Sequence, residues 1–193
     1  EEPQALFRFA VFGDFGDTDL SGGRAVAELV NGWNVDFILT VGDNVYAPQT
    51  LDTAVGQFYS DHISPYNGAY GDGSLINGFF PTLGNHEYAE GNVTTYFNYF
   101  TLPDNERYYD FQVGSAHFFA LNSNSEEPDG NSANSTQGQW LQAALGASDA
   151  MFNITYFHHT PYTPSGGDSD MRWPFEQWGV DAVFAGHDHD YYR

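Results

Sequence analysis

Residues 36 to 46 read DFILTVGDNVY. The first part of this stretch, from Asp36 to Val41, is too apolar to face water and is expected to form a buried strand. Gly42 and Asp43 follow it directly, so a carboxylate stands where the strand ends. In α/β proteins, binding and catalytic groups gather at the carboxyl ends of strands. This stretch therefore predicts both a buried strand and a polar site at its end.

The segments before it complete a βαβ unit. Leu6 to Phe12 is expected to form a buried strand, and Ser21 to cap a helix that runs to about Trp33. The rest of the chain continues the alternation of strands and helices. The expected elements are a helix over 52–64, a strand over 79–83, a helix over 93–100, a hairpin over 107–122, a helix over 136–145, and strands over 153–157 and 180–185. Residues 123–135 have loop composition and are expected to bury nothing.

The composition is that of a globular α/β domain. The 193 residues are 41% apolar and 18% aromatic, enough for a single domain with a substantial core. No apolar run approaches the length of a membrane span. The formal charge of -21 repels phosphate backbones and anionic lipid surfaces, so neither nucleic acid nor membrane is expected as a partner.

Cysteine is absent, so any metal site must use nitrogen and oxygen ligands. Three N-glycosylation sequons begin at Asn92, Asn134 and Asn153, and they favour a secreted glycoprotein. The oligomeric state has no signature in the sequence.

Side chains of the kind that bind metals follow five expected strands. They are Asp14, Asp43, the group Asn85-His86-Glu87, the pair His158-His159, and the pair His187 and His189. Each alone is weak evidence, because Asp near Gly is usually a turn and a lone histidine, such as His62 or His117, is usually a surface or hydrogen-bonded residue. Together they predict a metal site, since the chain contains no lysine to neutralise buried carboxylates.

The blocks GDFG, GDNVY, GNHE, FHHTP and GHDH, in this order, resemble the five motifs of the calcineurin-like metallophosphoesterases. Tyr46, three residues after Asp43, makes the chain similar to the purple acid phosphatase branch. The resemblance implies an α/β fold, a two-sheet αββα sandwich forming a single domain over residues 1–193. It also implies a first metal bound by Asp14, Tyr46 and His189, a second bound by Asn85, His159 and His187, and Asp43 bridging the two.

The activity implied by the resemblance is that of an acid phosphatase. Phosphate monoesters would be cleaved by attack of a metal-bound hydroxide at a centre of Fe(III) with Fe(II), Zn(II) or Mn(II). His86 would stabilise the transition state or protonate the leaving oxygen. The alternative for His86 is a hydrogen bond that orients a metal ligand, a role that Glu87 could also have.

Three features depart from or complicate the family pattern. His158 and His159 compete for one ligand position, and the spacing His159-Thr160-Pro161 favours His159, with His158 directed elsewhere. Family members often place another substrate-contacting histidine downstream, but residues 162–172 contain none, so Arg172 or Tyr162 is a candidate for phosphate contact. Family chains also continue beyond the last motif, so strands of the second sheet are expected to be missing after Arg193.

Two other functions remain open at this point. One is a phosphodiesterase or nucleotide hydrolase of the same superfamily, and the other is a metal-stabilised binding or assembly protein without turnover. The acidic surface and the missing downstream histidine favour the second alternative, whereas His86 and the full set of ligand types argue against it.

Overall fold

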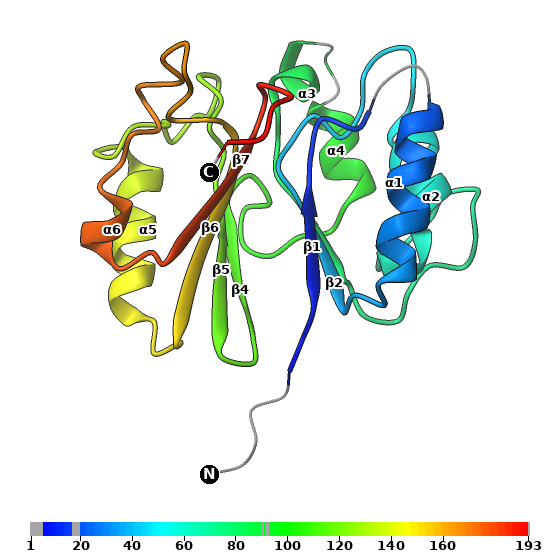
Figure 1. Ribbon diagram of the computed structural model, residues 1–193, viewed down its shortest axis with the longest axis horizontal. Coiled ribbons are helices and arrows are strands. Elements are labelled where there is room, and N and C mark those ends of the chain that lie inside the picture. Colours follow the sequence, from blue (N-terminus) through cyan, green and yellow to red (C-terminus); the bar gives the residue numbers. More distant parts are fainter. Residues whose placement is uncertain (1–5, 17–19, 90, 92, 193) are drawn as a thin grey trace.

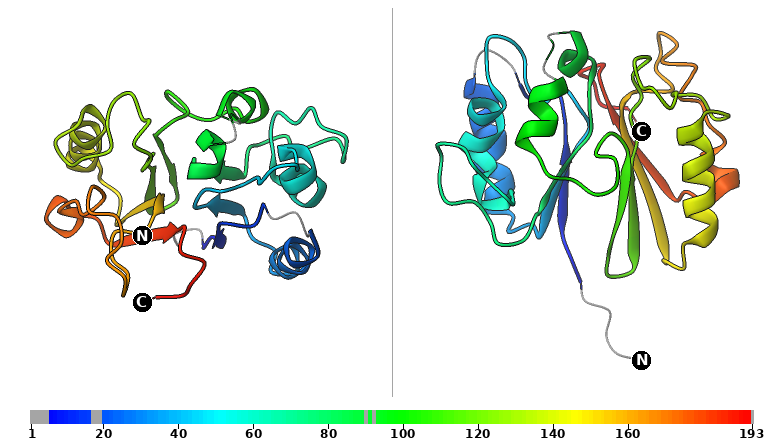
Figure 2. Two further views of the ribbon diagram at one scale, coloured as in Figure 1. Left: turned by 90° about the horizontal axis from the view of Figure 1, so that it is seen from above. Right: turned by 180° about the vertical axis from the view of Figure 1, so that it is seen from behind.

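The computed structural model describes residues 6–16, 20–89, 91 and 93–192. Two β-sheets face each other, and helices cover the outer side of each sheet (Figure 1). Seen from above, the four layers are helices, sheet, sheet and helices (Figure 2). The predicted two-sheet αββα sandwich is therefore confirmed.

The first sheet is parallel and has the strand order β1-β2-β3. Its strands are β1 (Phe9–Phe12), β2 (Phe37–Thr40) and β3 (Phe79–Pro81). Helix α1 (Leu20–Gly32) joins β1 to β2, as the predicted βαβ unit requires. The helix begins at Leu20, so Ser21 lies inside its first turn and does not cap it. All four residues of β2 are buried, in agreement with the apolar run that predicts this strand.

The segment predicted to be helical over 52–64 forms three short helical pieces. They are a π-helix at Asp52–Gly56, α2 (Gln57–Tyr59) and a 3-10 helix at Ser60–His62. Two more helices follow β3, namely α3 (Asn85–Ala89) and α4 (Val93–Tyr99). The sequence predicts α4 but not α3, because Asn85, His86 and Glu87 read as a loop.

The second sheet has the order β4-β5-β6-β7. The predicted hairpin forms its antiparallel part, β4 (Tyr109–Val113) and β5 (Ala116–Ala120). Strands β6 (Phe152–His159) and β7 (Ala182–Gly186) extend it in parallel. Helices α5 (Thr136–Ala147) and α6 (Phe175–Trp178) cover its outer face (Figure 1).

Aromatic rings fill the space between the sheets. The ring of Phe37 on β2 lies 5.4 Å from that of Phe9 and 5.2 Å from that of Phe118 on the second sheet. Phe118 is fully buried, so the two inner faces share one core. Burial of large aromatic side chains supplies most of the stabilisation expected of such an interface.

The prediction that residues 123–135 bury nothing is wrong. Ser123, Asn124 and Glu127 are almost fully buried. Glu127 accepts hydrogen bonds from the Arg107 guanidinium at 2.9 Å and from the Asn122 amide at 2.7 Å. These polar partners allow a segment of loop composition to lie inside the protein.

No helix in the described part of the chain has the length and apolarity needed to cross a membrane. Asn92, which begins one of the sequons, lies outside the described residues.

Candidate metal centre

The predicted site residues meet at one edge of the sandwich. Asp14 and Asp43 follow β1 and β2, and Asn85 begins α3 after β3. His158 and His159 end β6, whereas His187 and His189 follow β7. Because these five strands are parallel within their sheets, their carboxyl ends point to the same edge.

The backbone at this edge is unusual. Asp14, Asp43, His187 and His189 have positive φ angles of 57°, 50°, 77° and 55°. Non-glycine residues seldom adopt this left-handed conformation, which has an energetic cost and is concentrated at functional sites. At the turn after β7 it lets two nearby histidines face different targets. The His187 N–H donates to the Asp14 carboxylate at 3.0 Å, which ties this turn to the end of β1.

A first cluster of donor atoms forms around Tyr46. Its hydroxyl oxygen lies 3.2 Å from Asp43 Oδ2 and 3.3 Å from His189 Nε2. His189 Nε2 lies 3.4 Å from Asp14 Oδ1. These four side chains are the ones that the family resemblance assigns to the first metal and the bridge.

A second cluster forms around His158. Its Nε2 atom lies 2.9 Å from Asn85 Oδ1, 3.2 Å from His187 Nδ1 and 3.4 Å from Asp43 Oδ2. Asp43 Oδ2 thus contacts both clusters, as a bridging carboxylate would. The structure brings Asn85, His187 and Asp43 together as the sequence predicts.

His158 is the residue that sequence reasoning missed. The sequence directs it away from the site, but its ring is fully buried inside the second cluster. The spacing of His159 to Pro161 favours His159 for this position, whereas strand β6 continues through both histidines, with an irregular register after Tyr156. No signal in the sequence locates that irregularity.

His159 lies beside the cluster and has another partner. Its Nδ1 atom is 2.8 Å from the Ser123 hydroxyl oxygen, which also accepts the His159 N–H at 2.9 Å. Burial, together with the neighbouring His158 and His187, lowers the pKa of His159 to about 4. One nitrogen of each of these three histidines lies within 4.8 Å of the others. A ligand role for His159 stays a prediction.

The donor set fits a cation. His158 Nδ1 lies 2.8 Å from the Val41 carbonyl oxygen, which can only accept, so this nitrogen carries a hydrogen. The other nitrogen, Nε2, then faces the oxygens of Asn85 and Asp43. Acceptors that face one another repel unless a proton or a metal ion lies between them.

The pKa values of His158 and Asp43 agree with this requirement for a proton or a metal ion between them. Burial lowers the pKa of His158, but the hydrogen bond to Asp43 and its charge outweigh burial and raise it. Burial raises the pKa of Asp43, but His158 outweighs this effect and lowers it. Asp14 has a raised pKa because burial dominates. A positive charge at this point is therefore favoured by the surroundings.

Glu87 holds the loop that carries Asp43. Its fully buried carboxylate accepts the N–H groups of Gly84 at 2.6 Å, Asn44 at 2.8 Å and Asp43 at 3.2 Å. Burial and the charge of Asp43 raise the pKa of Glu87 to about 7. The sequence suggests a supporting role for this residue, and its contacts are those of a group that orients a ligand.

His86 lies at the surface of the site. Its N–H donates to Asp43 Oδ1 at 2.9 Å, its ring Nε2 lies 4.0 Å from Asp43 Oδ2, and its side chain is 37% exposed. The ring meets that of Tyr46 edge-on at 4.2 Å. Burial and the Asp43 charge raise the pKa of the Tyr46 phenol, so only a strong cation would remove its proton.

The two sheets contribute different kinds of donor. Every oxygen donor comes from the first sheet and its following loops, namely Asp14, Asp43, Tyr46 and Asn85. Every nitrogen donor comes from the ends of β6 and β7, namely His158, His187 and His189. Both clusters therefore contain donors from both layers.

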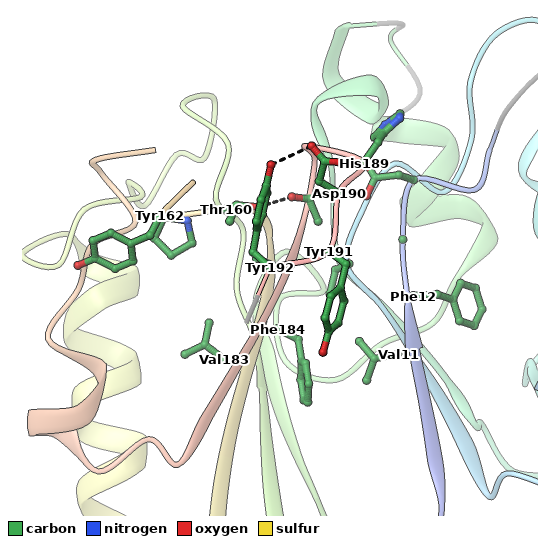
Figure 3. A pocket seen from close by; sticks show the side chains of 16 residues that line it. Val11, Phe12, Thr160, Tyr162, Val183, Phe184, His189, Asp190, Tyr191 and Tyr192 are labelled. Atoms are coloured by element: carbon green, nitrogen blue, oxygen red, sulfur yellow. Dashed lines mark hydrogen bonds and ion pairs between the residues drawn. The ribbon is translucent and has the colours of Figure 1, made fainter. Parts of the chain in front are cut away.

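Two cavities border the clusters. The larger, about 1060 Å³, lies between β1 and β7 and touches Asp14 and His189. Figure 3 shows its apolar lining, with Val11 and Phe12 from β1, Val183 and Phe184 from β7, and Tyr191 and Tyr192 from the turn that follows. The smaller, about 290 Å³, touches His159 and His187.

The fold and these clusters define an α/β protein with a candidate centre for two metal ions. Comparison with known proteins gives the family. The family model of the calcineurin-like phosphoesterases matches residues 7–191, nearly the whole chain. The protein therefore belongs to the calcineurin-like phosphoesterase family, which confirms the motif-based resemblance.

Two kinds of relative were found. Two uncharacterized proteins of Mycobacterium tuberculosis, one from each of two strains, are 30% identical over 145 residues, which cover 60% of this chain and 27% of each relative. The chain thus spans about a quarter of the length of these relatives. The structure of a purple acid phosphatase from yellow lupin (Lupinus luteus) seeds matches with a TM-score of 0.69 at 15% identity, covering 96% of this chain and 38% of that one. This match shows a shared fold.

Proposed function

We propose that this protein hydrolyses phosphate monoesters at a centre of two metal ions. The observation that carries the proposal is that two clusters of donor atoms, each with contacts of 2.9 to 3.4 Å, share the Asp43 carboxylate. The family is one of phosphoesterases, and the lupin protein of the same fold is named a purple acid phosphatase.

The ligand sets follow from the contacts. Asp14, Tyr46 and His189 would hold the first ion, and Asn85, His158 and His187 the second, with Asp43 between them. His158 is favoured over His159 because its Nε2 atom already lies against the oxygens of Asn85 and Asp43. His159 remains the alternative ligand until the two are compared by substitution.

Two bound metal ions would neutralise the negative charge of the phosphate and supply an activated water molecule. The residues of the chain would position the bridging Asp43 and protonate the leaving oxygen. The backbone N–H of His86 and the Glu87 hydrogen bonds keep Asp43 in place. The exposed His86 ring can give a proton to the leaving oxygen as the ester P–O bond breaks, so that the products are an alcohol and inorganic phosphate.

The metals we propose are Fe(III) at the first position with Fe(II), Zn(II) or Mn(II) at the second. Carboxylate and phenolate oxygens suit a hard trivalent ion, and imidazole and amide suit a borderline divalent ion. An Fe(III)–phenolate pair absorbs visible light, so the oxidised protein should be violet to pink and Tyr46→Phe should bleach it. A colourless protein that contains only zinc or manganese would place it outside the purple branch.

Hydrolysis of 4-nitrophenyl phosphate by the metal-loaded protein tests the activity. His86→Ala is expected to lower kcat by about 10² to 10⁴-fold and to leave two metal ions bound, because a positioned acid contributes on that scale. His62→Ala, remote from the centre, is the matched control. Hydrolysis of bis(4-nitrophenyl) phosphate at a higher kcat/KM would favour a phosphodiesterase instead. Metal binding without hydrolysis of either compound would favour a non-catalytic protein.

A further inference from the structure

The smaller cavity opens directly beside the second cluster. Its walls come from the end of β6, from the loop that follows it and from the turn that follows β7. They include two imidazoles, two hydroxyl groups and two carboxylates, which belong to His159, His187, Thr163, Ser165, Asp168 and Asp188. A molecule bound to the second cluster through its phosphate would extend its other end toward these groups.

The charged side chains that line this cavity are mainly negative. Lysine is absent from the sequence, and no arginine is among the described residues that line it. Arg172, on the same loop, is held by the loop itself. Its Nε donates to the Pro161 carbonyl at 3.0 Å, another guanidinium nitrogen donates to the Gly166 carbonyl, and the group stacks on Tyr162 at 5.1 Å. The only full charges on the cavity wall, apart from protonated histidine, are negative.

Asp168 is fixed in a position facing the site. Its N–H donates to the Thr160 carbonyl at 2.9 Å, and its Oδ1 accepts the Asp170 N–H at 2.8 Å. Its side chain lines the smaller cavity together with His159 and His187. Asp168 therefore occupies the loop where the sequence lacks the substrate-contacting histidine common in the family, and it carries the opposite charge.

We propose that the smaller cavity receives the leaving group of the ester and selects one with a positive charge, an amine or quaternary ammonium, over one with further negative charge. The inference rests on the proposed phosphomonoester hydrolysis. A cationic group would lie near Asp168 and Asp188, and a carboxylate or a second phosphate would be repelled by them. The overall charge of -21 acts in the same direction.

Three esters of similar size test this charge preference. They are 2-aminoethyl phosphate, 2-hydroxyethyl phosphate and phosphoglycolate, whose leaving groups carry a positive, no and a negative charge. The expected kcat/KM order is amine, then hydroxyl, then carboxylate. The first should exceed the last by about tenfold, the scale of ion contacts in a partly solvated pocket, and salt should reduce the difference.

Substitutions locate the source of the preference. Asp168→Asn removes the charge but keeps an oxygen that can accept the Asp170 N–H, so the amine-to-carboxylate ratio should fall to less than about threefold. Asp168→Lys should invert the ratio. The matched control is Asp149→Asn, which removes an exposed carboxylate from the turn between α5 and β6 and should leave the ratio at its wild-type value.

The outcomes separate the two proposals. Hydrolysis of 4-nitrophenyl phosphate with an amine-to-carboxylate ratio of one or less overturns the cavity inference alone, and this result needs no variant. A wild-type ratio retained in Asp168→Asn also overturns it. If the metal-loaded protein hydrolyses none of the esters, including 4-nitrophenyl phosphate, the proposed function is wrong and this inference falls with it.

Discussion

The candidate centre has a buried half and an exposed half. Glu87 and His158 are fully buried and Asp43 is 2% exposed, whereas the His189 side chain is 62% exposed. Protein groups hold the buried side chains, for example the Val41 carbonyl on His158 and three backbone N–H groups on Glu87. The imidazoles of His187 and His189, on the turn after β7, contact other side chains of the two clusters, namely His158, Tyr46 and Asp14. Folding therefore positions the buried half, and a metal ion must contribute to ordering the exposed half.

The largest effect on metal content is expected at Asp43, where the buried and exposed halves of the centre meet. Asp43→Asn should remove both metal ions and the activity with them, because its Oδ2 atom contacts both clusters. Elemental analysis of the purified variant measures the metal content. Asp61→Asn, an exposed change remote from the centre, is the control. Retention of two equivalents in Asp43→Asn would show that this carboxylate does not join the halves.

The next largest effect is expected from substitution of His158, and comparison with the same substitution of His159 shows which of the two binds the metal. His158→Ala should lose the second metal ion and lower the free energy of unfolding by about 1–3 kcal/mol, because the buried Val41 carbonyl loses its partner. His159→Ala should keep both ions. Metal analysis and urea denaturation of the two variants give the answer. Loss of the second ion in His159→Ala alone would restore the assignment based on sequence spacing.

Glu87→Gln should have a smaller effect on the metals, a 10- to 100-fold loss of affinity, as expected for a group that orients a ligand. It should also change the pH dependence of the metal-free protein. Burial raises the pKa of Glu87 from 4.5 to about 7, so between these values the folded state holds a proton that the unfolded chain has released. Stability therefore falls as pH rises through this window, by up to about 3 kcal/mol.

Urea denaturation from pH 4 to pH 8 in the presence of a chelator measures this dependence. The wild-type slope between about pH 4.5 and 7 should be reduced in Glu87→Gln, because the amide does not titrate. An identical slope in the two proteins would mean that Glu87 is ionised throughout this range in the folded state.

The smallest effect on folding is expected in the exposed half. His189→Ala should weaken the first metal site but change the free energy of unfolding of the metal-free protein by less than about 0.5 kcal/mol, as is usual for a surface position. Urea denaturation with and without a chelator checks both statements. A change of more than about 1 kcal/mol without metal would contradict the contrast between the halves.

The sequence predicts the fold well because the signals are local. The apolar run ending at Val41 marks β2, and the turn at Gly114-Ser115 between β-rich segments marks the hairpin of β4 and β5. Helix α3 escapes prediction because it has only five residues and its site-forming side chains resemble those of a loop. The burial of Glu127 is not predicted because one of its partners, Arg107, is distant in the sequence.

The site is predictable in part for the same reason. Asp14, Asp43 and Asn85 stand directly after apolar strands, so their common edge follows from the parallel arrangement. The choice between His158 and His159 depends on an irregular strand register and on the Val41 carbonyl, more than 100 residues away. Such long-range contacts have no counterpart in motif spacing.

The division of donors between the sheets has a mechanical consequence. Each metal ion would join oxygen atoms of the first sheet to nitrogen atoms of the second, and would act as a cross-link between the layers. The chain has no cysteine, so no disulfide can do this. Removing the ions would leave the aromatic core and the direct hydrogen bonds at this edge, such as those from His158 to Val41 and from His187 to Asp14, to connect the layers.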